Sequence, residues 1–211
     1  MKDENPRELH FAQWAPETDE HFDVDPENVL SLRLAEIIAQ ETNGQTLETV
    51  DIGCGSGALG RLLGEMSPRL QIDGVDISTS LLALAEKALR ADGKPCYREL
   101  LEADLRKPVY FGANHYELLL SSGLFVPGLL GASDLVAMVQ SVRARGRLIV
   151  GIDKSHFDNA AFKIVIQEAV WAETITEPTY TEVEMFETTS DRYGEKALIA
   201  QFSKVPTLND L

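Results

Sequence analysis

A glycine-rich turn joins a predicted strand to a predicted helix at residues 50–57, which read VDIGCGSG. Residues 46–52 are rich in β-branched side chains, as in a buried strand, and an apolar helical pattern begins at Ala58. This succession places backbone N–H groups and a helix N-terminus close to a ligand. Glycine is needed because the turn is tight and a Cβ would separate the backbone from the ligand. The Asp51 carboxylate disfavours a phosphate there and favours a ligand with positive charge.

Strand and helix patterns alternate along most of the chain. Strands are predicted at residues 46–52, 70–76, 97–101, 115–121 and 147–152, and helices at 25–44, 58–65, 78–93, 133–145 and 157–172. Two further strands, 180–189 and 196–204, are joined by a short turn and form a β-hairpin. One of them must therefore run antiparallel to the rest. The sequence predicts an α/β fold with a seven-stranded, mostly parallel sheet, a reversed strand in the C-terminal hairpin and helices on both faces.

The bulk properties fit a single domain over residues 25–211, preceded by an arm of residues 1–24. The chain has 211 residues, of which 44% are hydrophobic, and a net charge of −15. That charge argues against nucleic acids and anionic membranes as partners. Two cysteines form neither a disulfide framework nor a zinc site, and no metal site is predicted. Without a signal peptide or a run of about 20 apolar residues, we expect a cytoplasmic protein. The sequence leaves the oligomeric state open.

Three acids lie at or just after the carboxyl ends of successive predicted strands, where an open α/β sheet forms its binding crevice: Asp51, Asp76 and Asp104. Asp76 is placed to accept hydrogen bonds from both hydroxyls of a ribose. Asp104 could accept from the exocyclic amine of an adenine, cap a helix, or do both. Asp51 could lie near an ammonium group. With Ile77 and Leu105 as apolar faces for the base, these residues outline a ligand made of an amino acid, a ribose and an adenine.

Four motifs along the chain form a set. They are DIGCGSG at residues 51–57, VDIS at 75–78, EADL at 102–105 and the segment 116–123. The set resembles the motifs of class I S-adenosylmethionine-dependent methyltransferases, and the resemblance covers residues 25–204. It implies their Rossmann-like fold and S-adenosylmethionine as the cofactor. It also implies cofactor contacts from the turn, the strand ends and the fourth strand: Asp51, Gly53, Cys54, Gly55, Asp76, Ile77, Asp104, Leu105 and Ser121.

The N-terminal arm carries the motif FAQWAP at residues 11–16. This motif, the segment 121–125 and the region of Trp171 resemble small methyltransferases similar to the Williams–Beuren-region methyltransferase-like proteins. In that group the arm covers the cofactor, which implies that residues 1–24 form a lid and that Trp14 is a cofactor contact. The chain departs from the group at Thr18, where a tyrosine is usual.

Methyl transfer from a sulfonium mainly requires proximity, alignment and exclusion of water, and a base only if the nucleophile arrives protonated. Two residues near the crevice are candidate catalytic groups, His156 and Ser122, although His156 is equally explained as a surface or capping residue. Candidate walls of an acceptor pocket follow from position in the fold: Phe125, Phe157 and Trp171, together with Trp14 and His156. No Asp/Asn-Pro-Pro-Tyr/Phe motif, Pro-Cys nucleophile or magnesium-type carboxylate set is present. The sequence therefore favours a small molecule as the methyl acceptor.

Two other functions remain alternatives. The glycines of the turn also satisfy the dinucleotide fingerprint of a nicotinamide oxidoreductase. Asp51, Asp104 and the C-terminal hairpin favour S-adenosylmethionine instead, and none of the five tyrosines has the lysine four residues on that a hydride-transfer pair needs. An S-adenosylmethionine-binding protein without turnover, regulatory or scaffolding, belongs to a different class. A protein or RNA methyltransferase is a further alternative.

Overall fold

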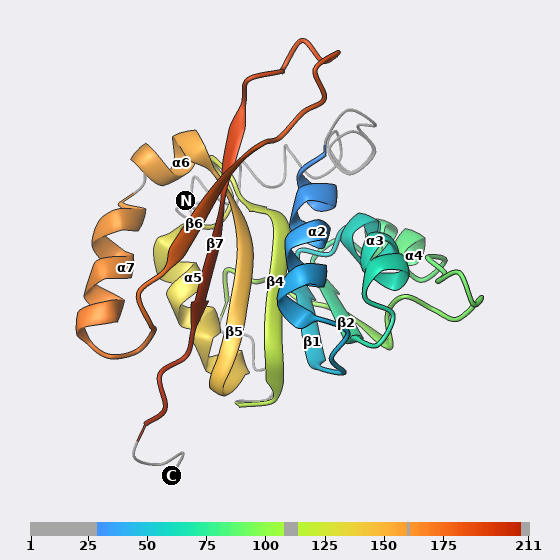
Figure 1. Ribbon diagram of the computed structural model, residues 1–211, viewed down its shortest axis with the longest axis horizontal. Coiled ribbons are helices and arrows are strands. Elements are labelled where there is room, and N and C mark those ends of the chain that lie inside the picture. The colour runs from blue at the N-terminus through green and yellow to red at the C-terminus, as the bar shows by residue number, and fades with distance from the viewer. Residues whose placement is uncertain (1–28, 108–113, 160, 208–211) are drawn as a thin grey trace, which may run out of the picture.

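The computed structural model describes residues 29–107, 114–159 and 161–207. Its seven strands form one sheet in the order β3-β2-β1-β4-β5-β7-β6 (Figure 1). The strands are β1 (Glu48–Ile52), β2 (Gln71–Asp76), β3 (Glu99–Glu102), β4 (Tyr116–Phe125), β5 (Val142–Asp153), β6 (Thr179–Glu184) and β7 (Lys196–Ser203). Strands β1 to β5 pair in parallel, and β7 runs antiparallel to both β5 and β6. The predicted sheet, including its reversed hairpin strand, is confirmed.

Helices cover both faces of the sheet, as predicted (Figure 1). One face carries α2 (Leu30–Thr42), α3 (Ala58–Met66) and α4 (Thr79–Ala85), and the other carries α5 (Ala132–Met138), α6 (Lys154–Asn159) and α7 (Phe162–Trp171). Alternate residues of each central strand point to opposite faces. On β4, Leu118 and Leu120 therefore enter the core under α2 to α4, whereas Leu119 enters the core under α5 to α7.

Three predicted helices differ from the observed ones. The helix predicted over 78–93 ends at Ala85, because the chain turns back there and Cys96 N donates to Ala88 O at 2.9 Å. The helix predicted over 133–145 ends at Met138 and passes through the 3₁₀ turn η1 (Val139–Ser141) into β5. The helix predicted over 157–172 is two helices, α6 and α7. Arg143 and Arg145, expected at a helix end, lie on β5 instead, because pairing with β4 already begins at Val142.

The predicted arm of residues 1–24, with Trp14, and the predicted helix start at residues 25–26 lie outside the described residues. In the described part, no helix has the length and apolar character needed to cross a membrane.

Candidate functional site

The glycine turn, residues 53–57, folds back onto β2. Gly53 N and Cys54 N both donate to Val75 O, at 2.8 and 3.0 Å, and Gly57 N donates to Cys54 O at 2.9 Å. The three glycines of the turn all have positive φ, which side chains with a Cβ adopt only with strain. The amides of Gly53, Cys54 and Gly57 bond within the protein. For these three amides, the expectation that the turn directs its N–H groups at a ligand is therefore corrected. A phosphate site needs such amides to point at the anion.

Asp76, at the end of β2, holds the middle of this turn. Its Oδ2 accepts from Gly55 N and its Oδ1 accepts from Ser78 N, both at 2.9 Å. Ser78 in turn caps α4, because its Oγ accepts from Leu81 N at 3.3 Å. The carboxylate is thus fixed by backbone on two sides. Each of its oxygens has a second acceptor position, so bonds from two hydroxyls remain compatible with these contacts. Ile77 lies partly buried beside it.

Asp51, at the end of β1, lies beneath the glycine turn. Its neighbours Val50 and Ile52 enter the core under α5 to α7, so Asp51 points to the opposite face, where the residue is only 1% exposed. Its Oδ2 accepts from the Tyr97 hydroxyl at 2.8 Å. Sequence reasoning assigned Tyr97 only to a strand. The signal that could have found it is the first glycine after the turn, Gly60, which lies inside α3 and leaves room for the Tyr97 ring.

Asp104 follows β3 and is held by an ion pair that the sequence did not predict. Arg106 Nε and Nη2 lie 2.8 and 2.9 Å from the two carboxylate oxygens, and Lys107 Nζ lies 3.3 Å from Oδ2. The hydrogen bond from the Arg106 side chain is the main cause that lowers the pKa of Asp104 to about 2. The described segment continues from Asp104 to Lys107 and contains no helix. Within these residues, Asp104 therefore does not cap a helix. Leu105 packs, partly buried, against the core under α5 to α7.

The end of β4 leaves the regular sheet at the same edge. Ser121 pairs with Val150 but Phe125 pairs with Ile152, so residues 122–124 bulge out of register. The Ser121 hydroxyl is fully buried and has no hydrogen-bond partner among the described residues. Within the bulge, Leu124 lies over the turn, since a Cβ at Gly53 would come within 3.1 Å of its side chain. The bulge, which includes Ser122, thus brings β4 next to the glycine turn.

His156, one candidate catalytic group, is tied to the backbone. One ring nitrogen, Nε2, lies 2.9 Å from Leu130 O, and the ring packs edge-on against Phe162 at 5.2 Å between centroids. Its backbone N donates to Asp153 Oδ1 at 2.8 Å. These contacts give His156 a role in fastening α6 to the loop before α5, in line with the capping alternative.

Among the candidate pocket residues, Phe125, Phe157 and His156 gather around the ring of Phe162, and Trp171 lies apart from them. Phe125 and Phe157 are buried and pack on Phe162, with ring centroids 6.5 and 5.7 Å away. Trp171 is 76% exposed at the end of α7, just before Ile175, which bridges Lys204 beyond the end of β7. Because β7 is antiparallel to β5, that position lies at the edge of the sheet opposite the acids.

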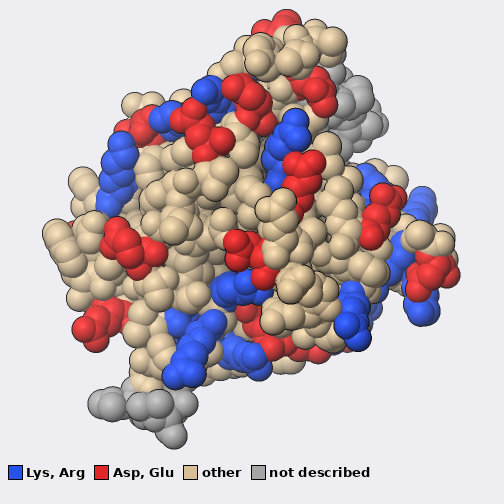
Figure 2. Space-filling view, viewed as in Figure 1, with Lys and Arg blue, Asp and Glu red and all other residues tan. Residues whose placement is uncertain are grey.

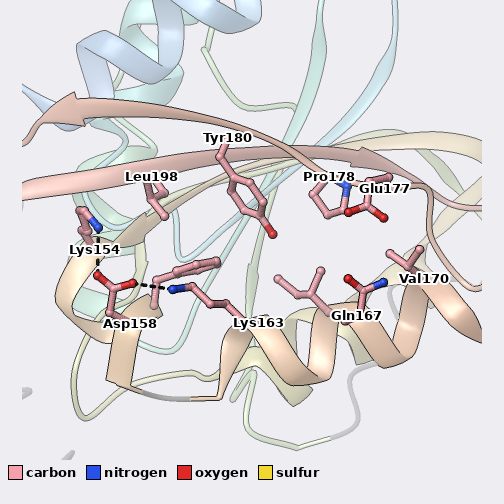
Figure 3. Close-up of a pocket in the computed structure, with 11 residues that line it drawn as sticks. Lys154, Asp158, Lys163, Gln167, Val170, Glu177, Pro178, Tyr180 and Leu198 are labelled. Atoms are coloured by element: carbon pink, nitrogen blue, oxygen red, sulfur yellow. Dashed lines mark hydrogen bonds and ion pairs between the residues drawn. The ribbon is translucent and has the colours of Figure 1, made fainter.

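A separate pocket of about 340 Å³ lies between α6 and α7 on one side and β6 and β7 on the other (Figure 3). Lys154 and Lys163 both pair with Asp158 at one end, at 2.9 and 3.1 Å. The Tyr180 side chain points into the pocket (Figure 3). Phe157 is also among the residues that line it. No residue of the glycine turn or of the ends of β1, β2 or β4 lines it. Phe157 therefore faces this pocket rather than the crevice.

The structure thus gathers the turn, the three acids and Ser121 at the carboxyl ends of β1 to β4. It places Asp51 below the turn, Asp76 against it and Asp104 beyond it, in the order of the neighbouring strands β1, β2 and β3. Within the described residues, no group of three or more His, Cys, Asp or Glu side chains could hold a metal ion.

Comparisons with known proteins find similarity to methyltransferases. Residues 49–147, from β1 into β5, match a family model described as a methyltransferase domain. No curated protein matches the sequence. A putative RNA methyltransferase from Pyrococcus horikoshii has a TM-score of 0.60 at 13% identity, covering 83% of this chain and 84% of that one. TYW2 from M. jannaschii, solved in complex with AdoMet, has a TM-score of 0.59 at 11% identity, with coverage of 83% and 76%.

A predicted O-methyltransferase from Agrobacterium tumefaciens is similar to the same degree, with a TM-score of 0.58 at 14% identity and coverage of 82% and 80%. At such identities these structures show a shared fold, and their acceptors are chemically diverse. The chain thus contains a match to a methyltransferase domain over residues 49–147, and as a whole it shares the fold of these methyltransferase structures.

Proposed function

We propose that the chain transfers a methyl group from S-adenosylmethionine to a small-molecule acceptor, with the cofactor lying across the ends of β1, β2 and β3. The observation that carries the proposal is the row of acids on these three neighbouring strands: Asp51, Asp76 and Asp104. In that order they suit the methionine ammonium, the ribose hydroxyls and the adenine amine. Gly53, Cys54 and Gly55 then lie under the methionine and ribose, and Ile77 and Leu105 lie beside the base.

The hydrogen bonding of the turn supports a cofactor without phosphates. The Gly53, Cys54 and Gly57 amides bond within the protein, and Gly55 N donates to the Asp76 carboxylate. A pyrophosphate would meet this anion at the middle of the turn, which costs electrostatic energy, whereas the cationic sulfonium and ammonium of S-adenosylmethionine would not. Ser121 lies on β4 near the same strand ends, and its buried hydroxyl, which has no hydrogen-bond partner among the described residues, would offer the cofactor a further polar contact.

Charge and the contact of His156 with Leu130 O support the choice of acceptor. The chain carries 34 acidic and 19 basic residues, and the face in Figure 2 shows both kinds interspersed over it. Nucleic-acid binding instead draws on clustered lysines and arginines. Because Nε2 of His156 contacts Leu130 O, we do not assign this residue as a base. The acceptor would then react as a free amine, a thiolate or another group that does not depend on a protein base.

Isothermal titration with S-adenosylmethionine, S-adenosylhomocysteine and NADH tests the cofactor. We expect micromolar binding of the first two and no heat from NADH. Tight NADH binding with no heat from the others would sink the proposal. A screen with methyl-labelled S-adenosylmethionine over small amines, carboxylates and phenols, with bulk RNA and protein as further arms, tests the acceptor. Labelling confined to RNA or protein would contradict a small-molecule acceptor.

The contacts of His156 also favour a second candidate, a regulatory or scaffold protein that binds S-adenosylmethionine without turnover. Such a protein needs the cofactor site but no base. Tight S-adenosylhomocysteine binding with no labelled product from any arm of the screen would favour this candidate over the enzyme.

A further inference from the structure

Tyr97 occupies a slot made of glycines beneath the cofactor turn. A Cβ at Gly60 would lie 2.4 Å from Tyr97 Cζ, one at Gly74 would lie 2.9 Å from Cδ1, and one at Gly57 would lie 3.0 Å from Cε2. These glycines come from α3, β2 and the turn. A glycine inside a helix costs about 1 kcal/mol relative to alanine, so Gly60 needs a reason, and the aromatic ring lying against its Cα supplies one.

The ring ends in a hydroxyl that donates to Asp51 Oδ2 at 2.8 Å. Burial and the adjacent Asp51 carboxylate raise the pKa of Tyr97 well above its usual value, so the hydroxyl stays protonated and remains a donor. A buried carboxylate depends on such charge-assisted bonds both to keep its charge and to keep one orientation.

We propose that Tyr97 is a positioning residue for the amino-acid end of the cofactor, acting by holding the charged Asp51 carboxylate in place beneath the turn. This proposal rests on the proposed function, because it assigns Asp51 to the methionine ammonium. Tyr97 contacts the glycine turn from below, through Gly57, and its side chain is buried there, so we expect it to act on the cofactor only through Asp51 and the turn. Its effect must therefore be selective for ligands that carry an ammonium group.

That selectivity gives a test with two ligands. S-Adenosylhomocysteine has the amino-acid group, whereas 5′-methylthioadenosine has the adenine and the ribose without it. Tyr97→Phe removes only the hydroxyl and keeps the ring in its slot. By isothermal titration we expect Tyr97→Phe to weaken S-adenosylhomocysteine about tenfold and to leave 5′-methylthioadenosine within about twofold.

Tyr116→Phe is the matched control. Tyr116 is also a buried tyrosine that donates to an aspartate, Asp73 Oδ2 at 3.1 Å, but it lies at the start of β4, at the opposite edge of the sheet. We expect it to change neither affinity. Asp51→Asn should show the same ligand selectivity as Tyr97→Phe. The double variant should be no weaker than Asp51→Asn alone, because Tyr97 acts through the charge of Asp51.

Three results would overturn the proposal. Equal losses for both ligands in Tyr97→Phe would show a general packing role. Unchanged S-adenosylhomocysteine affinity would show that the hydroxyl does not position the amino-acid end. Full additivity in the double variant would show that Tyr97 does not act through Asp51. A wild-type chain that binds neither ligand would instead defeat the proposed function, and the assignment of Tyr97 with it. Thermal unfolding of each variant verifies that the comparison is made between folded proteins.

Discussion

Asp51, Asp76 and Asp104 end three adjacent strands, yet each carboxylate has a different partner. Asp51 is buried and bonds to a phenol, Asp76 bonds to two backbone amides, and Asp104 is paired with a guanidinium. A guanidinium lowers a carboxylate pKa, a buried phenol holds the group without neutralising it, and backbone amides fix its direction. The three acids are therefore chemically distinct, which suits the three distinct groups of one cofactor.

Replacing Asp76 with alanine should remove the acceptor of the ribose hydroxyls and also release Gly55 N. Loss of a charged acceptor costs about 1.5–3 kcal/mol per bond, so S-adenosylhomocysteine affinity should fall more than tenfold. Isothermal titration measures this fall. Asp92→Ala, which removes an exposed acid paired with Lys94, is the control and should leave affinity unchanged. An Asp76→Ala variant that binds as well as the wild type would show that Asp76 does not face the ribose.

The ion pair of Asp104 should be visible in its titration. Carbon-detected NMR of the carboxyl group should give a pKa of about 2, and Arg106→Ala should raise it toward 3.8. Because the folded value lies below the unfolded one, the pairing stabilises the fold above about pH 4. This contribution disappears as pH falls from about 4 to 2. An Asp104 that titrates near 3.8 in the wild-type chain would contradict the pairing.

At the scale of the element, α3 combines two tasks, since its first turn follows the glycine turn and its inner face receives Tyr97. Gly60→Ala should destabilise the fold by about 1–2 kcal/mol, because the strain from the new Cβ outweighs the gain in helix propensity. Gly64→Ala, on the same helix, meets only Arg90 and Cys96 at 3.1 and 3.2 Å and is the matched control. Urea unfolding gives both free energies of unfolding. Equal free energies of unfolding for the two variants would show that Tyr97 does not fill the space beside Gly60.

The end of β4 is the other element that shapes the site. Its bulge at residues 122–124 carries Leu124 over Gly53, and Gly151 on β5 makes room for it, because a Cβ there would lie 2.9 Å from Ser122 O. The periodicity of the sequence indicated a strand that ended at Ser121. The four additional residues, through Phe125, are strand only because β5 continues alongside them.

At the scale of the whole molecule, the proposed cofactor would join strand ends that the chain visits far apart in sequence. Ligand binding to the folded state alone stabilises it by about 2.7 kcal/mol at a concentration 100 times Kd. For a chain of this size that corresponds to a rise of about 5–10 °C in Tm. Thermal scanning with S-adenosylhomocysteine should show this rise, and Asp76→Ala should abolish most of it at the same concentration. An unshifted Tm would argue against binding.

We also propose that the arm of residues 1–24, which includes Trp14, acts as a lid over the cofactor. If the arm closes over the cofactor, S-adenosylhomocysteine should slow proteolytic cleavage within residues 1–24 by several-fold, as followed by mass spectrometry. Cleavage in the loop between β6 and β7, which carries the exposed Tyr193, should be unaffected and is the internal control. Equal protection at both places would indicate general stabilisation rather than closure of the arm.

The sequence by itself determined the sheet, the reversed hairpin, the glycine turn and the row of acids, because each depends on local periodicity or on backbone conformation. Only the tertiary structure decided which groups hold each acid, since Tyr97 reaches Asp51 across 46 residues of chain. The tertiary structure likewise decided that Trp171 is exposed to solvent and that Arg143 and Arg145 lie on a strand. Hydrogen bonds, packing and strand pairing join residues that no local pattern relates, and here they set the partners of the site.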